Sequence, residues 1–421
     1  MFRQQTIHNM AWRKRDLARR CMSLCVCVMT IALFTACASE AEREDPTHSR
    51  DETGTSQDSK ADGSWKPQPS SDELTLSCSE PSRSWNPNGV HELSGTPQFE
   101  GWYYRATEPN SGESWVIITA YWLDRNGDGR SFIELIQGST GDTYKRVFED
   151  VDVKAYQENT GEFALSIGDV FFSADLISGR FTDERGAEVA LELEVDACAY
   201  WGAPEHDRNR WTMGWATEVV GPPLKWHVHH LKGEASGYIE IRHEGEVKRA
   251  DLSGAPLHQE KNWGNAFPKR WVWLQSNVFE DRPDVAFAAA GGPVFGFDLS
   301  PSGYMMGLRI RNQFFNWRTQ DGHSFKDVSF KTDPETGLAI WTLRAESLRY
   351  RADVRATGPI SELIAVDVPA DGGLAFGAFE HLSAELKVDL YMRSGLGWRL
   401  VDSVTSQLAA VEAGGEFTEG L

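Results

Sequence analysis

The sequence predicts an all-β protein made of two consecutive antiparallel β units. From Phe99 onward, short apolar stretches recur between turn residues at intervals that suit strands joined by hairpins. Glycine is frequent, with 38 residues in a chain of 421, and long helical periodicities are scarce. An irregular aromatic segment, Tyr200 to Pro223, divides the strand series, so we expect one β-barrel at 76–223 and a second at 224–421.

The first 37 residues have the layout of an export signal. Basic residues precede an apolar run at 21–34, which is shorter than the roughly 20 residues that a lasting transmembrane helix needs. The run ends in Leu-Phe-Thr-Ala-Cys37, which resembles a bacterial lipobox except that Phe34 replaces the usual aliphatic residue. We expect lipidation at Cys37 and anchoring in the bacterial cell envelope, at the outer membrane; an ordinary signal peptide cut nearby is the alternative.

Residues 38–75 contain almost no large apolar side chain and cannot offset the entropy of ordering, so we expect a flexible acidic linker. The whole chain has 42 basic and 62 acidic residues, a formal net charge of -20. This charge disfavours nucleic acid and anionic surfaces as partners.

Two cysteines, Cys78 and Cys198, remain once Cys37 is lipidated and the signal is removed. An even pair in an oxidising compartment is compatible with a disulfide. Two buried thiols are equally compatible, because the sequence does not supply the distance between them.

Residues 124–129 match the first half of a calcium loop, with oxygen-bearing side chains on alternate positions. The position that should hold the bidentate glutamate is Leu135. Because the segment lies between two expected strands, a hairpin turn is the favoured interpretation.

The stretch from His258 to Phe279 is the densest in side chains suited to binding, with three tryptophans, two phenylalanines and five carboxamides. At the strand period of two, one face carries Trp271, Trp273, Gln275 and Asn277, and the other carries Val272, Leu274, Ser276 and Val278. The first face combines aromatic surfaces with amides, as the wall of an apolar ligand cavity requires. His258 and Glu260, ahead of a turn at Pro268, are expected to face the same cavity.

Glu260 is the candidate proton donor. A carboxylic acid in an apolar pocket can keep its proton and deliver it to an alkene, and aromatic faces then stabilise the carbocation. Trp263, Trp271 and Trp273 would supply those faces. The alternative is a structural ion pair of Glu260 with Lys261 or Arg270.

His227 and His229 alternate on one expected strand and, with His258 or Glu260, would suit zinc. A histidine-rich strand lining a polar part of the cavity is favoured instead, with His229 orienting the head of a ligand, so no metal is predicted. The sequence contains no nucleophile elbow, phosphate loop, dinucleotide fingerprint or Cys-x-x-Cys metal pair.

The central motifs resemble the tocopherol cyclase family. The resemblance is carried by the opening strand Gly101–Arg105, by Met213-Gly214-Trp215, by Trp226–Leu231, and above all by Glu260–Gly264 and Trp271–Phe279. It implies two lipocalin-like β-barrels related to the carotenoid hydratase group. It also implies protonation of a prenylated hydroquinone and ring closure to a chromanol, without a metal or redox cofactor.

With that resemblance, we expect a hydrophobic small-molecule ligand: a prenyl quinol, a carotenoid-like polyene or a lipid. The expected ligand-binding residues are Trp102, Tyr104, His229, His258, Trp263, Trp271, Trp273, Gln275 and Asn277. A non-catalytic lipocalin-like carrier or lipid sensor is the competing hypothesis, and a zinc hydrolase or hydratase is the third. The plant and cyanobacterial members of the family act in photosynthetic membranes, whereas this chain carries an apparent export signal.

Overall fold

The structure, a computed structural model, describes residues 90, 97–149, 153–155, 163–202, 212–214, 221–294, 301–370, 373–419 and 421. These residues belong to one compact unit, Asp72–Leu421. The expected signal segment, the linker, Cys37 and Cys78 lie outside the described residues, as does the side chain of Cys198. Lipidation and the disulfide therefore stay predictions.

The described residues form two antiparallel sheets and contain no α-helix, which confirms the predicted all-β class. The first sheet has twelve strands: β1 (Gln98–Thr107), β2 (Ser114–Leu123), β3 (Gly129–Gln137), β4 (Thr143–Phe148), β5 (Val153–Ala155), β6 (Ala164–Ile167), β7 (Val170–Ser173), β8 (Leu176–Thr182), β9 (Glu188–Ala199), β10 (Leu224–His243), β11 (Glu246–Asp251) and β12 (Ala255–Gly264).

The second sheet has ten strands: β13 (Arg270–Ser276), β14 (Ala286–Pro293), β15 (Ser302–Ile310), β16 (Gln313–Arg318), β17 (Ser324–Asp333), β18 (Leu338–Glu346), β19 (Tyr350–Pro359), β20 (Ile364–Ala370), β21 (Gly373–Ser394) and β22 (Gly397–Gly415). Three short 3-10 helices complete the described elements: η2 (Thr319–Asp321), η3 (Ile360–Glu362) and η4 (Glu416–Thr418). No helix among these residues is long and apolar enough to cross a membrane.

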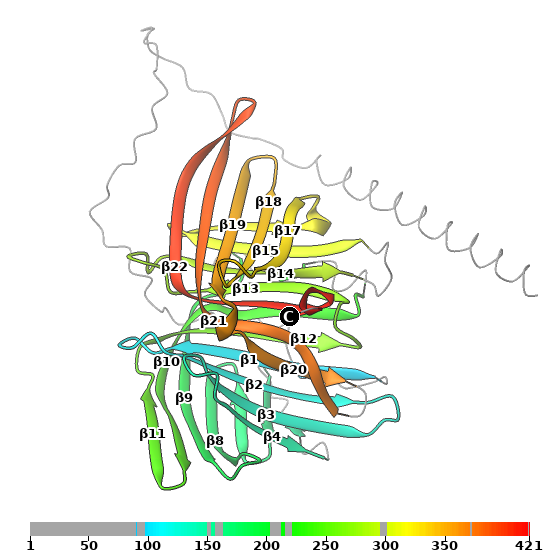
Figure 1. The fold of residues 1–421 in the computed structure, drawn as a ribbon, viewed down its shortest axis with the longest axis vertical. Helices are drawn as coiled ribbons and strands as arrows, with labels where there is room; N and C mark the ends of the chain where they lie inside the picture. Colours follow the sequence, from blue (N-terminus) through cyan, green and yellow to red (C-terminus); the bar gives the residue numbers. More distant parts are fainter. Residues whose placement is uncertain are drawn as a thin grey trace, which may run out of the picture. The chain divides into compact units, whose positions relative to one another are not determined.

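The strand order shows how the chain is wound (Figure 1). The first sheet runs β4-β3-β2-β1-β12-β10-β9-β8-β7-β6-β5, with β11 paired to β10. The second runs β16-β15-β14-β13-β22-β21-β19-β18-β17, with β20 paired to β21. In each sheet the last long strand returns to pair beside the first, since β12 pairs β1 and β22 pairs β13. The two sheets therefore share one winding scheme.

The chain passes from one sheet to the other between β12 and β13, across the turn that contains Pro268. Strands β10 to β12 pair within the first sheet, although the expected second unit began at residue 224. The proposed division into domains at 223/224 stays a prediction, whereas the change of strand pairing lies at 265–269.

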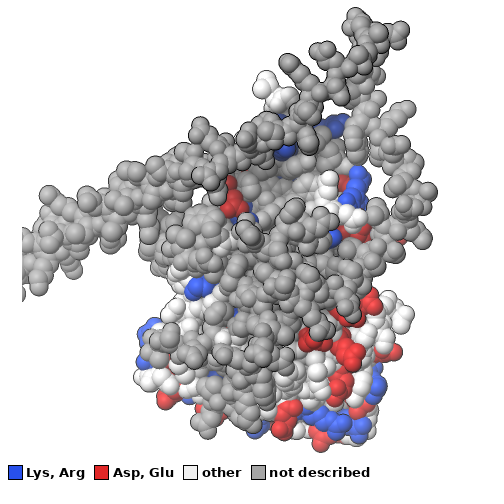
Figure 2. Space-filling model, turned by 180° about the vertical axis from the view of Figure 1, so that it is seen from behind, with Lys and Arg blue, Asp and Glu red and all other residues white. Residues whose placement is uncertain are grey.

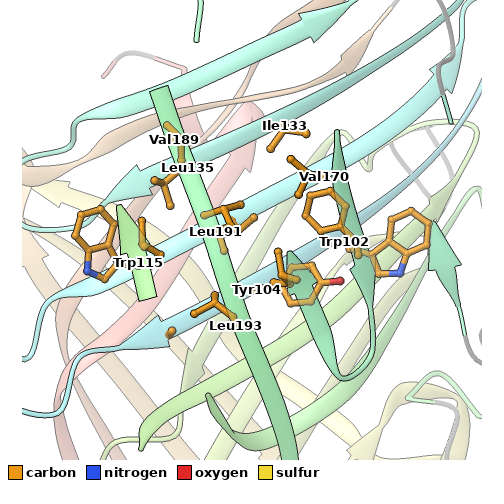
Figure 3. Close-up of a cluster of buried hydrophobic side chains, with 14 of the residues drawn as sticks. Trp102, Tyr104, Trp115, Ile133, Leu135, Val170, Val189, Leu191 and Leu193 are labelled. Atoms are coloured by element: carbon orange, nitrogen blue, oxygen red, sulfur yellow. The ribbon is translucent and has the colours of Figure 1, made fainter. Parts of the chain in front are cut away.

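Each sheet curls around an apolar core of its own. In the first, Trp102, Tyr104 and Trp115 meet aliphatic side chains of β3, β7 and β9 (Figure 3). In the second, Val272 and Leu274 of β13 pack with Trp341 of β18 and with β21 and β22. The predicted split of β13 into two faces is therefore present, because Trp273 belongs to a different cluster from its neighbours.

Three strands lack a clear sequence signal. In β8, Ser178-Gly179 has the composition of a turn, and β17 carries two lysines and two aspartates that break the apolar alternation. In β20, Pro369 argues against a central strand, and β20 indeed pairs with β21 alone. The expected hairpin turn after β2 is confirmed, since Asp124 Oδ1 accepts hydrogen bonds from the backbone N–H groups of Asn126 and Asp128, at 2.7 and 3.0 Å.

Gly237, within the 20-residue strand β10, tests how tightly β9 and β10 are joined. Its φ is +126°, and an added Cβ would lie 1.9 Å from the carbonyl oxygen of Glu192. We expect Gly237→Ala to lower the free energy of unfolding by more than about 2 kcal/mol. In the nearby turn, Gly245 has φ +85° and open space around its Cβ, so Gly245→Ala should cost only about 1 kcal/mol. Urea unfolding of both variants measures the difference, and equal losses would contradict it.

Candidate active site

The two sheets meet through side chains of both, and strand alternation decides which ones. On β1, Trp102 and Tyr104 point into the core of the first sheet, whereas Tyr103 and Arg105 reach residues of the second sheet. Trp273 of β13 and Trp226 of β10 belong to one apolar cluster between the sheets. At the rim, Lys145 of β4 forms a 2.7 Å ion pair with Asp367 of β20.

Two hydrogen bonds cross the interface in opposite directions. The hydroxyl of Tyr103, on the first sheet, donates to Glu380 Oε1 on the second at 2.5 Å. The indole N–H of Trp273, on the second sheet, donates to Glu260 Oε2 on the first at 2.8 Å. The rings of Tyr103 and Trp273 meet edge to face, with centroids 5.1 Å apart. All four side chains are mostly buried.

The strand registers explain why these groups gather. Tyr103 lies opposite Glu260 on β1 and β12, and Trp273 lies opposite Glu412 on β13 and β22. Glu412 in turn lies opposite Glu380 on β21. Side chains opposite each other on one face of a sheet are neighbours. Three carboxyl groups, Glu260, Glu380 and Glu412, are thereby brought together; we call them the carboxyl cluster.

Two members of the carboxyl cluster hold protons near neutral pH. Burial raises the pKa of Glu380 to about 8, and the carboxyl of Glu412 adds to that rise, while Tyr103 and Arg105 oppose it. Burial also raises the pKa of Glu412 to about 7, although the indole of Trp271 donates a hydrogen bond to it. Burial and the nearby Glu380 raise the pKa of Tyr103 well above 10, so its hydroxyl stays a donor.

Glu260 has a different environment. Its Oε2 accepts the hydrogen bond from Trp273 and lies 3.0 Å from Nε2 of His258. Glu380, by contrast, has one oxygen bound to Tyr103 and a second, Oε2, that is buried without a protein partner. Glu380 therefore has an oxygen free to present a proton.

Arg105 holds a group of buried polar atoms in place beside the carboxyl cluster. Its guanidinium donates to Gln275 Oε1 at 3.1 Å, to Ser114 Oγ at 2.7 Å and to the carbonyl oxygens of Leu382 and Leu408, at 3.0 and 2.7 Å. Arg105 and Gln275 are almost fully buried. The amide nitrogen of Gln275 and both amide atoms of Asn277 have no protein partner, so they could serve a ligand.

Lys261 and Glu100 form a second buried group, on the opposite face of β1 and β12. They make an ion pair with both side chains fully buried, and Tyr121 donates a hydrogen bond to Glu100. The ammonium of Lys261 lies 5.2 Å from the Trp102 ring and 5.0 Å from the Trp263 ring. Burial lowers the pKa of Lys261, while Glu100 opposes this. Lys261 thus pairs with Glu100 rather than with Glu260, contrary to one sequence-based alternative.

Arg270, the other partner considered for Glu260, is half exposed and lies 3.7 Å from Glu416. Neither of the two cations considered for Glu260 pairs with it, because Lys261 pairs with Glu100 and Arg270 lies beside Glu416.

The histidine-rich part of β10 also faces the core side of the first sheet. The rings of His227 and His229 are 5.2 Å apart, and His229 packs 4.9 Å from Phe163. Burial lowers the pKa of His227 to about 3 and that of His230 to about 4, so both are neutral. Within the described ranges, no group of three or more His, Cys, Asp or Glu side chains has the geometry to hold a metal ion.

The structure divides the predicted site residues between two places, the space between the two sheets and the core face of the first sheet. Near the carboxyl cluster lie Glu260, His258, Trp271, Trp273 and Gln275. Trp102, Tyr104, Trp263 and His229 lie on the other face of the sheet. Asn277 is buried just after β13. These residues therefore do not line one common site.

Sequence reasoning missed Tyr103, Arg105, Glu380 and Glu412. Glu412 had a usable signal, because it is the one charge in the apolar run Ala409-Ala410-Val411-Glu412-Ala413. Tyr103 and Arg105 lie in the motif that was singled out, each directly after one of the two residues chosen, Trp102 and Tyr104. Glu380 follows Phe379 in a segment whose strand was not predicted.

Comparison with known proteins gives a family match and two plant relatives. The family model described as "Tocopherol cyclase-like" matches residues 170–415. The chain is 27% identical over 384 residues to "Tocopherol cyclase, chloroplastic" of Zea mays, covering 78% of this chain and 77% of that protein. It is 24% identical over 381 residues to "Probable tocopherol cyclase, chloroplastic" of Oryza sativa subsp. japonica, covering 78% of each. Among solved structures, kievitone hydratase from Nectria haematococca is similar with a TM-score of 0.44 and 14% identity, over 78% of this chain and 93% of that one.

Fold and site together define an all-β protein of two antiparallel sheets with a buried carboxyl cluster between them. The family match covers more than half of the chain. The chain belongs to the tocopherol cyclase-like family.

Removal of one partner of the buried ion pair should be costly. In Lys261→Met, the carboxyl of Glu100 stays buried without its cation, and we expect a loss of about 3–5 kcal/mol in the free energy of unfolding. The double variant Glu100→Gln, Lys261→Met removes both charges and should recover part of this loss. Urea unfolding of the two variants checks the order, and a double variant less stable than Lys261→Met would contradict it.

The raised pKa of Glu380 has a consequence for stability. An unfolded glutamate titrates near about 4.3, whereas folded Glu380 titrates at about 8. Between these values the folded state binds the extra proton, so Glu380 makes the free energy of unfolding fall as pH rises from about 4 to about 8. Glu380→Gln should remove this part of the pH dependence. Urea unfolding between pH 5 and pH 8.5 compares the slopes, and identical slopes for both proteins would contradict the assignment.

Proposed function

We propose that this protein is an acid-type cyclase or hydratase acting on a hydrophobic prenyl quinol or polyene. The proposal rests above all on the carboxyl cluster, which has two protonated acids near neutral pH beside Tyr103 and Trp273. An acid with a pKa near the working pH is suited to general acid catalysis. Membership of the tocopherol cyclase-like family and the names of the plant relatives support the same reaction class.

In the proposed reaction a carboxyl group donates one proton to the substrate and regains one at the end. A carboxyl O–H bond breaks and a C–H bond forms at the less substituted alkene carbon, which leaves a tertiary carbocation. The faces of Trp273 and Tyr103 stabilise that cation. A phenolic oxygen of the same molecule, or a water molecule, then forms the C–O bond and releases its proton to the carboxylate. Cyclisation is balanced within one molecule, and hydration consumes one water.

Two residues compete for the role of donor. Glu260 is the donor that the sequence predicts, and that assignment stays a prediction. The hydrogen bonds favour Glu380, because its free Oε2 can hold the proton while Tyr103 binds the other oxygen. Glu260, which accepts from Trp273, is better suited to stabilise developing positive charge.

The exported location is proposed on the sequence alone. A lipidated Cys37 followed by an acidic linker would hold the domain near the membrane in which a prenyl lipid resides.

Turnover of a prenylated hydroquinone by the full-length protein, followed by mass spectrometry of substrate and chromanol, tests the reaction. We expect Glu380→Gln to lower kcat by at least about 100-fold, since general acids contribute about 10²–10⁴-fold. Wild-type activity should fall as pH rises through about 8, where Glu380 loses its proton. Glu385→Gln, an exposed carboxyl on the same strand, is the matched control and should retain full activity.

The same assay decides between the donors and between the function classes. Loss in Glu260→Gln with full activity in Glu380→Gln would return the donor role to Glu260. Stoichiometric recovery of unchanged hydroquinone bound to the wild-type protein would instead support the non-catalytic carrier and refute the enzyme.

A further inference from the structure

One end of the second sheet differs in its surface from the other described parts of the chain. The hairpins β18–β19 and β21–β22 end side by side there, joined by a 2.8 Å hydrogen bond from the backbone N–H of Arg393 to the carbonyl of Arg349. The β21–β22 hairpin projects at the top of Figure 1. We call this surface, residues 346–351 and 391–400, the hairpin end.

The hairpin end exposes large apolar side chains at its turns. Leu348 is 90% exposed and Leu396 is fully exposed, at 103%, while Leu400 is 51% exposed. The described residues expose six large hydrophobic side chains in all, so half of them lie on this one surface. Exposed leucines gathered at the ends of two adjacent hairpins have no role in the core of the fold and indicate a contact surface.

Basic residues surround these leucines. The hairpin end contains four arginines, Arg349, Arg351, Arg393 and Arg399, against one acid, Glu346. Arg393 pairs with Glu346 at 3.4 Å and Arg351 with Asp353 at 3.1 Å, while Arg349 and Arg399 are exposed. Figure 2 shows this end at the top, as a white tip with blue side chains near it. A chain with a net charge of -20 thus carries a locally basic surface. The net charge of the whole chain led us to expect that anionic surfaces are disfavoured as partners. A local surface can behave differently, because in salt a charge acts only over about 10 Å.

Amphipathic aromatic side chains complete the pattern. The guanidinium of Arg393 stacks 4.0 Å above the Trp398 ring, and that of Arg351 stacks 4.1 Å above the Tyr391 ring. The hairpin end has leucine at its tip, tryptophan and tyrosine behind the tip, and arginine around them. Proteins that lie in the interfacial region of a bilayer use the same types of side chain in this order.

We propose that the hairpin end docks on an anionic lipid bilayer. Leu348 and Leu396 enter the boundary between headgroups and acyl chains, and the exposed arginines Arg349, Arg393 and Arg399 contact lipid phosphates. The occupant is a lipid surface rather than a protein, because exposed leucines at the tip with the exposed Arg349 and Arg399 beside them match a plane of phosphates over acyl chains.

Docking does not depend on the proposed reaction. Glu380 lies on the same strand as Arg393, thirteen residues earlier, so the hairpin end and the carboxyl cluster are separate regions of β21. Vesicle binding can therefore succeed where turnover fails, and the two results are distinguishable.

Hydrogen exchange with mass spectrometry on the full-length protein tests the proposal, because it locates the contact whether or not Cys37 is lipidated. We expect segments 346–351 and 391–400 to exchange at least about fivefold more slowly on vesicles with 30% phosphatidylglycerol than on pure phosphatidylcholine vesicles. The turn at 243–247, which carries the exposed Val247, is the internal control and should not change. The slowing should disappear at 1 M salt.

Two sets of variants complete the test. Leu348→Ser with Leu396→Ser, and Arg349→Gln with Arg393→Gln and Arg399→Gln, should each abolish the slowing at the hairpin end, while Val247→Ser should leave it intact. Equal exchange with and without anionic vesicles would overturn the proposal. Slowing that depends on protein concentration and not on vesicles would overturn it as well, in favour of contact between two copies of the chain.

Discussion

The structure depends on a pair of hydrogen bonds that cross between the sheets in opposite directions, from Tyr103 to Glu380 and from Trp273 to Glu260. Tyr103 is the register partner of Glu260, Trp273 is that of Glu412, and Glu412 is in turn that of Glu380. The two sheets therefore fix each other's position at the same point where the acids gather. The contact that joins the sheets and the carboxyl cluster of the proposed reaction lie at the same place.

That arrangement has an energetic cost that is informative. Burying ionised carboxyl groups next to one another is unfavourable, so such groups retain their protons. The raised pKa values of Glu380 and Glu412 express this cost. A fold selected only for stability would place apolar residues there, as it does at Ala378 and Ala413 on the same strands. Lys261 and Glu100 solve the problem differently, by pairing opposite charges. This contrast supports the proposal that the carboxyl cluster is the functional site.

Much of the fold follows from local sequence pattern. Alternation along β13 gave its two faces, and the turn Asp124-Arg125-Asn126-Gly127-Asp128 gave the β2–β3 hairpin, because both depend on residues next to one another. The candidate site was found only in part. Glu260 and Trp273 do meet, yet on different sheets, and Glu380 and Glu412 come from strands more than a hundred residues away. Long-range register decides which residues become neighbours, and no local pattern contains it. The same lack of register placed Trp102 and Glu260 in one expected cavity, although they project from opposite faces of paired strands.

The change of sheet at 265–269 has a consequence for when the protein can act. Residues before it supply Tyr103 and Glu260, and residues after it supply Trp273, Glu380 and Glu412. The raised pKa values of Glu380 and Glu412 come first from burial, and both parts of the chain form the interface in which these carboxyls lie. A chain whose two sheets have not yet met exposes these carboxyl groups to water, where glutamates are ionised at neutral pH. The protons that the proposed reaction would use are therefore held only once the two sheets have assembled, so folding and the capacity to donate a proton are coupled.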